Sequence, residues 1–429
     1  MPSRRKSSVK RNLLLLALLT LTTVVLIAAV GMRQRQPVFI FEAPLSAEAR
    51  MRDPDNAYPL LVEAEALLPK LGATHFSTLF VGWKSEFFNQ IQRRAWNGLL
   101  QLSLAEGDTQ AIREFLKSAG PAFAKTSEAL ARPKLLFPES RSHLWDDSLR
   151  FQTLAFTHII AGAGDLQAFP VQERINHLVQ TIRLARLLAQ EGSNFQALQL
   201  ESAAFTALCR LAVRAQSPQE LDPIQAALDA VPTPYGDRAA SLEHFWRAID
   251  DALALPRPTE KDRDMGEIIG GRAYAWFLQQ QAAYVREHQA ELREWAALKP
   301  GEFRERLEES LKSAHLAGPV RETLEQQAQV VSLAARTHAM YEAARLCLAL
   351  ERHRLAHKTY PDQLALLAPT YLPTLPTDPT TGEPFVFTNK GGNYLLTSSD
   401  AATLTERRAA NAAFISPRLW ALPGEAVEP

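Results

Sequence analysis

The residues best spaced for chemistry are two histidines near the C-terminal end of the chain. His353 and His357 are four positions apart, so on a helix both imidazoles lie on one face and are weak candidates for a metal site. No glutamate follows His353 directly, and no third ligand lies nearby. The alternative is a helix C-terminus, where the helix dipole favours cationic side chains such as Lys358. The sequence favours this second interpretation, and we predict no metal and no cofactor.

Other residue types that carry chemistry lack the spacing that catalysis needs. None of the ten histidines belongs to a Glu-x-x-His pair, the signature of di-iron helical bundles. The chain has no Gly-x-Ser-x-Gly elbow and no phosphate-binding glycine loop. Adjacent acidic pairs such as Asp146-Asp147 point about 100° apart on a helix, which indicates a solvated face or a cap. We therefore predict no catalytic residue and favour a protein that is not an enzyme, although active sites also assemble from distant residues.

The composition indicates a folded protein without a nucleic-acid partner. Hydrophobic residues make up 46% of the 429 positions and charged residues 22%. Lysine plus arginine equals aspartate plus glutamate, at 47 each, whereas nucleic-acid binders carry a basic excess. The length fits about two or three domains.

The two cysteines, Cys209 and Cys347, lie in apolar stretches with a helical pattern. In such a place a free cysteine is a small buried hydrophobic residue, whereas an oxidising compartment would allow the two to pair. The sequence leaves both alternatives open. No group of cysteine and histidine has the spacing of a zinc site.

An apolar segment near the N-terminus predicts a membrane anchor. Residues 13–31 begin with an uncharged run of 18 residues, which as a helix nearly matches a hydrocarbon layer of roughly 30 Å. Five basic residues precede it, so the positive-inside rule makes residues 1–12 a cytoplasmic basic tail. We expect a single-pass protein of the bacterial cell membrane that contacts the bilayer through residues 13–31. The bulk of the chain is then extracytoplasmic, in the periplasm. The alternative is a cleaved signal peptide, because Ala29-Val30-Gly31 offers small residues for cleavage.

Residues 46–318 predict an extracytoplasmic all-α domain. Apolar residues recur at helical spacing in two neighbouring segments, separated by a short break around Gly192. They are Ile175, Leu178, Val179, Ile182 and Ala185, then Phe205, Leu208, Cys209 and Ala212. Two such segments joined by so short a break predict an antiparallel hairpin. Strand signals are nearly absent and no fixed repeat length is visible, so we expect an irregular array of helical hairpins.

Residues 319–400 predict a long helix followed by a small α+β module. The helical pattern runs to Lys358, and two strand-like runs flank Asn389-Lys390-Gly391-Gly392, whose residues accept the positive φ of a tight turn. A lone hairpin is marginally stable in water, so it should pack on the end of the long helix. Residues 401–429 are expected to form a loosely ordered tail. The predicted fold class is thus mainly α, with an N-terminal transmembrane helix, helical hairpins and a C-terminal module with a β-hairpin.

The order of elements in residues 340–399 resembles the globular head of type II secretion major pseudopilins. Both have a helix that ends at Tyr-Pro, a proline-rich loop with Asp-Pro and Gly, and a hairpin with a tyrosine in its last strand. The matching residues are Tyr360, Pro361, Asp378, Pro379, Gly382 and Tyr394. The resemblance implies the fold of the module. It does not extend to pilus assembly, since no processing site precedes Leu13 and most of the chain separates the two segments.

The whole layout also resembles uncharacterised membrane-anchored helical proteins of planctomycete and verrucomicrobial bacteria, a resemblance that implies no activity. We therefore expect a membrane-anchored, extracytoplasmic helical scaffold that binds other envelope proteins. Two alternatives stay open. One is a secretion-related, pseudopilin-like envelope component, and the other is an envelope hydrolase or ligand-binding protein.

Overall fold

The computed structural model describes the centre of the chain and the C-terminal module. The described residues are 47–69, 113–137, 151–163, 169–190, 194–231, 291, 294–295, 298, 300–313, 318–398 and 413–415. The predicted basic tail (1–12) and membrane anchor (13–31) lie outside them, as does most of 401–429. None of the helices within these ranges combines the length and the apolar character that crossing a bilayer requires.

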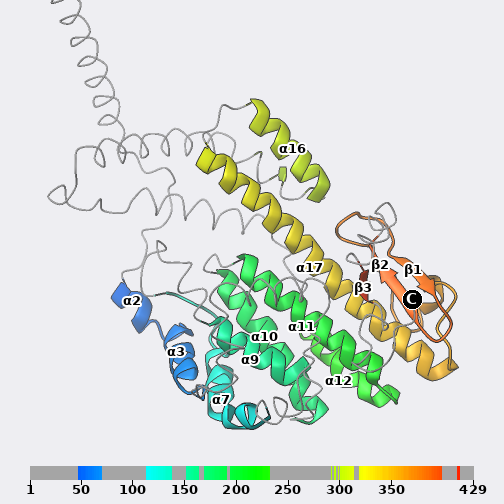
Figure 1. Cartoon of the computed structure of the whole chain (residues 1–429), viewed down its shortest axis with the longest axis horizontal. Coiled ribbons are helices and arrows are strands. Elements are labelled where there is room, and N and C mark those ends of the chain that lie inside the picture. The colour runs from blue at the N-terminus through cyan, green and yellow to red at the C-terminus, as the bar shows by residue number, and fades with distance from the viewer. Residues whose placement is uncertain are drawn as a thin grey trace, which may run out of the picture.

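The described part is mainly helical, as the sequence predicts. Its helices are α2 (Ala47–Arg52), α3 (Tyr58–Ala66), α7 (Gly120–Ala129), α9 (Gln152–Ala163), α10 (Val171–Gln190), α11 (Asn194–Arg214), α12 (Pro218–Asp229), α16 (Pro300–Ser313) and α17 (Gly318–His357). A 3₁₀ helix, η4 (Leu364–Leu367), and the strands β1 (Val386–Asn389), β2 (Tyr394–Thr397) and β3 (Ala413–Ile415) follow. Figure 1 shows α17 running along the array, with α11 and α12 on one side and the strands on the other.

The predicted hairpin of α10 and α11 is confirmed and lies at the centre of the array. Its apolar positions are buried, from Ile175 and Ile182 on α10 to Phe205 and Leu208 on α11. One core joins α10, α11, α12 and α17 with the C-terminal module. A second core joins the other end of the hairpin to α3, α7 and α9. The two helices therefore connect both halves of the array.

The C-terminal module folds against the end of α17, as predicted. The helix closes at Lys358, whose φ of 62° is the left-handed conformation that commonly ends a helix. Strands β1 and β2 form an antiparallel hairpin in which Asn389 lies opposite Tyr394. Strand β3, from the segment predicted as a loosely ordered tail, pairs antiparallel with the other edge of β2. The prediction missed this strand because three residues carry too little alternating pattern to identify a strand.

Helices α9 and α10 pack tightly at Gly162, and this contact yields a testable prediction. A Cβ atom there would lie 2.5 Å from Cγ of Leu178 and 2.9 Å from the carbonyl oxygen of Arg174. We expect Gly162→Ala to lower the free energy of unfolding by about 2 kcal/mol, because the two helices must separate. Urea denaturation measures this change. The control is Gly120→Ala, where nothing lies within 4 Å of the added atom, and a similar loss there would contradict the explanation.

Candidate functional site

The two histidines considered as metal ligands lie at the exposed end of α17. Their rings are 4.3 Å apart. Nδ1 of His353 lies 3.0 Å from the carbonyl oxygen of Thr359, and Nε2 of His357 lies 3.3 Å from the hydroxyl of Tyr371. One ring nitrogen of each imidazole thus contacts the segment that follows the helix. Within the described ranges, no three histidine, cysteine, aspartate or glutamate side chains gather as metal ligands.

The structure divides the residues that define the module into two groups, with Pro361 apart from both. Tyr360 and Tyr394 are buried and pack edge to face, with ring centroids 4.8 Å apart. Asp378, Pro379 and Gly382 form a separate turn, in which the amide of Gly382 donates to the carbonyl oxygen of Asp378 at 2.7 Å. Pro361 supplies a carbonyl oxygen to the side chain of Asn389 at 3.1 Å, which ties the helix end to the hairpin.

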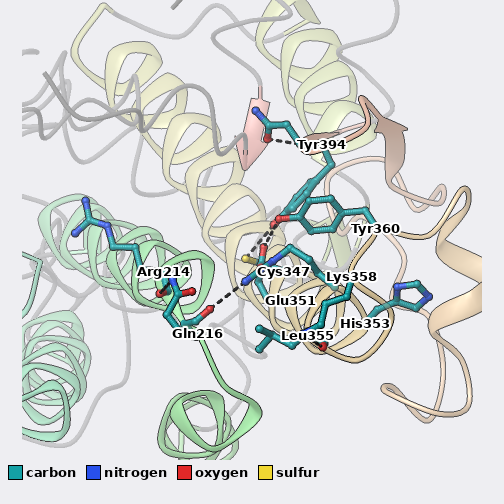
Figure 2. A network of polar contacts seen from close by, with 12 residues as sticks. Arg214, Gln216, Cys347, Glu351, His353, Leu355, Lys358, Tyr360 and Tyr394 are labelled. Carbon is teal, nitrogen blue, oxygen red and sulfur yellow. Dashed lines mark hydrogen bonds and ion pairs between the residues drawn. The ribbon is translucent and has the colours of Figure 1, made fainter. Parts of the chain in front are cut away.

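The first group belongs to a buried polar cluster where the module meets the array. We call this set of residues the junction cluster: Cys209, Cys347, Glu351, Arg354, Tyr360 and Tyr394. Figure 2 shows Glu351 and Cys347 on neighbouring turns of α17, with the two tyrosines above them. The hydroxyl of Tyr360 donates to Oε1 of Glu351 at 2.9 Å, and that of Tyr394 donates to Sγ of Cys347 at 3.2 Å. Two side chains of the module therefore donate hydrogen bonds to side chains of α17.

Arg354 connects the junction cluster to the array. Its Nε donates to Oε2 of Glu351 at 2.5 Å. One of its terminal nitrogens donates to the carbonyl oxygen of Ala215, just after α11, at 3.0 Å. The carboxylate of Glu351 is fully buried, yet both of its oxygens have a donor. A buried charge with such partners holds its neighbours in one arrangement.

Burial decides the protonation of the junction cluster. It raises the pKa of Glu351, and the nearby guanidinium of Arg354 only partly opposes this effect. Burial also raises the pKa of Tyr360 and of Tyr394, so both phenols stay neutral and can donate. The hydrogen bond with Cys209, together with burial, raises the pKa of the Cys347 thiol. Because only a thiolate is strongly nucleophilic, the arrangement is suited to holding the module in place and poorly suited to covalent catalysis.

Sequence reasoning missed Glu351 and Arg354 as members of a site. The available signal was spacing: Glu351 follows Cys347 by four positions and Ala343 by eight, which places it on the buried face of the helix. An acidic residue on such a face requires a partner, and Arg354 lies at the spacing that provides one.

No model of a protein family, no curated protein and no solved structure matches the chain. Its possible roles therefore follow from its own residues.

A buried pair of histidines lies between α9 and α10. Nδ1 of His158 and Nδ1 of His177 are 3.0 Å apart, and the rings of Phe123 and Phe169 pack against His177. Burial lowers the pKa of His177 to about 4. Burial and the neighbouring His177 hold the pKa of His158 well below its usual range. Both imidazoles are therefore neutral at pH 7, with one donating to the other.

Proposed function

We propose that this protein is a single-pass, membrane-anchored scaffold of the bacterial envelope. Its extracytoplasmic helical array binds other envelope proteins, and its C-terminal module is a fixed part of that array. Support for the anchor comes from the apolar residues 13–31 and the basic residues that precede them. Support for the scaffold comes from one observation: α17 belongs to the array and to the module at the same time.

Because the array and the module both pack on α17, we expect them to form one rigid unit rather than two parts joined by a hinge. Tyr394 and Leu396 of the hairpin lie in the same core as Leu350 of α17 and Leu208 of α11. Turning the module away from the array would expose this core to water, at about 25 cal/mol for each Å² of apolar surface. A molecule with a continuous core presents its outer surfaces in a constant relative arrangement, which suits a scaffold.

The same packing favours the scaffold over the secretion-related alternative. A subunit of a pilus-like filament would use the long helix before its head to contact neighbouring subunits. In this chain α11 and α12 cover one side of α17, and η4 and β3 lie against it as well. A filament contact through those faces would have to displace part of the core.

Site-specific photo-cross-linking in cells tests the proposal. The cross-linker replaces exposed apolar residues, Leu366 and Val386 on the module and Leu67 and Val171 on the array. The matched control is the exposed Lys390 in the turn between β1 and β2. We expect full-length protein in the membrane fraction and defined adducts with envelope proteins from at least one apolar position, which are absent from the control.

The other outcomes separate the alternatives. Adducts with secretion-system components alone would support the pseudopilin-like role. A soluble product without adducts would overturn the anchored scaffold and favour the hydrolase or ligand-binding alternative. A rise in melting temperature with one member of a glycan panel would then identify a ligand.

A further inference from the structure

The only two cysteines of the chain meet in the core of the protein. Cys209 on α11 and Cys347 on α17 are 138 positions apart, yet both side chains belong to one buried core. Sγ of Cys347 also lies 3.9 Å from the carbonyl oxygen of Cys209. Both side chains are buried and both are free thiols in this structure. No other cysteine competes for either partner.

We propose that Cys209 and Cys347 form an intramolecular disulfide that fastens α17, and with it the C-terminal module, to α11. A disulfide requires sulfur atoms at about 2.05 Å on side chains whose Cβ atoms lie roughly 4 Å apart. Sγ of Cys347 already lies against the backbone of Cys209 across two packed helices, so rotation of the two side chains would bring the sulfur atoms together. The bond would close a large covalent loop that contains the C-terminal end of α11, all of α12 and most of α17.

The order of events follows from burial. Thiol–disulfide exchange starts from a thiolate, and the raised pKa of Cys347 together with its burial suppresses this species in the folded protein. The bond therefore forms while the chain folds, before α17 docks fully. One cysteine thiolate attacks glutathione disulfide and releases one glutathione thiolate. The second cysteine, as its thiolate, then displaces the other glutathione, so two cysteine thiols are oxidised and one disulfide is reduced to two thiols.

The junction cluster accommodates the bond. The hydroxyl of Tyr394 donates to Sγ of Cys347, and a disulfide sulfur is still a weak acceptor. The partners of Glu351 do not involve either sulfur. The same contacts would therefore surround the oxidised pair, and burial would protect it from reductants.

Oxidative refolding of the full chain tests this inference. Reduced, denatured protein is refolded in a buffer of reduced and oxidised glutathione, quenched with acid, denatured and labelled with a polyethylene glycol maleimide. We expect no labelled thiol before reduction and two after it, with a linked Cys209–Cys347 peptide in the mass spectrum. Reduction should lower the Tm by about 10 °C, because the bond restricts the unfolded chain.

The double variant Cys209→Ser, Cys347→Ser is the matched control, and its Tm should not respond to reductant. Two reactive thiols after oxidative refolding would overturn the inference, and so would disulfide-linked dimers on non-reducing gels. The labelling of the unsubstituted chain decides the question even where the variant fails to fold. The experiment uses purified protein, so its result is independent of the proposed location and scaffold role.

Discussion

Replacing Glu351 by alanine is expected to lower the free energy of unfolding by about 3 kcal/mol. The substitution removes the acceptor for the hydroxyl of Tyr360, which is buried, and for Nε of Arg354, which is partly buried. It also opens a cavity between α17 and the hairpin. Urea denaturation, followed by circular dichroism, measures the change.

Two variants serve as controls for this prediction. Glu351→Gln keeps the shape and an acceptor oxygen but removes the charge. One of the two donors keeps its acceptor and no cavity opens, so the glutamine variant should cost less than Glu351→Ala. Asp222→Ala breaks the ion pair with Arg352 on the surface of the same helix, and should cost less than about 0.5 kcal/mol. A Glu351→Ala loss no greater than that of Asp222→Ala would show that the junction cluster does not hold the module.

Acidification from pH 7 to pH 4.5 is expected to lower the free energy of unfolding by a net amount of about 3 kcal/mol, with the His158–His177 pair as the main cause. Burial lowers the pKa of both imidazoles, to about 4 for His177. In the unfolded chain they bind protons below a pKa of about 6.5, whereas in the folded protein they stay neutral. The unfolded state therefore binds more protons in this range, and stability falls as the pH falls.

Two buried carboxyl groups act in the opposite direction. Burial raises the pKa of Glu201 and of Glu351, so in the folded protein both bind a proton more readily than in the unfolded chain. Their contribution to stability is present at low pH and is lost as the pH rises. For this reason the expected net loss is smaller than the roughly 5 kcal/mol that two fully suppressed histidines would produce over two pH units.

The double variant His158→Leu, His177→Leu isolates the contribution of the pair. It replaces both partners at once, so no buried ring nitrogen is left without its neighbour. Denaturation at pH 7 and pH 4.5 should show at most a small loss for this variant. An NMR titration should place the pKa of His177 near 4. An equal loss in the variant and the unsubstituted protein would mean that other groups control the acid response.

The sequence by itself determined the mainly helical class and several local elements. The helical spacing from Ile175 to Ala185 and from Phe205 to Ala212 predicted α10 and α11, because a helix with one buried face must repeat apolar residues at about 3.6 positions. Asn389-Lys390-Gly391-Gly392 predicted the turn between β1 and β2, and Gly391 indeed has a φ of 77°. These features depend on residues that are close neighbours in the chain.

Only the tertiary structure decided which of these faces meet. The pairing of His158 with His177, the contact between Cys209 and Cys347, the burial of Glu351 under the hairpin and the addition of β3 to β2 all join separate elements. Local periodicity shows that a face is buried but not what covers it. The packing of one element against another selects the partners, as α11 against α17 does for the two cysteines, and that packing depends on the shapes of both elements together.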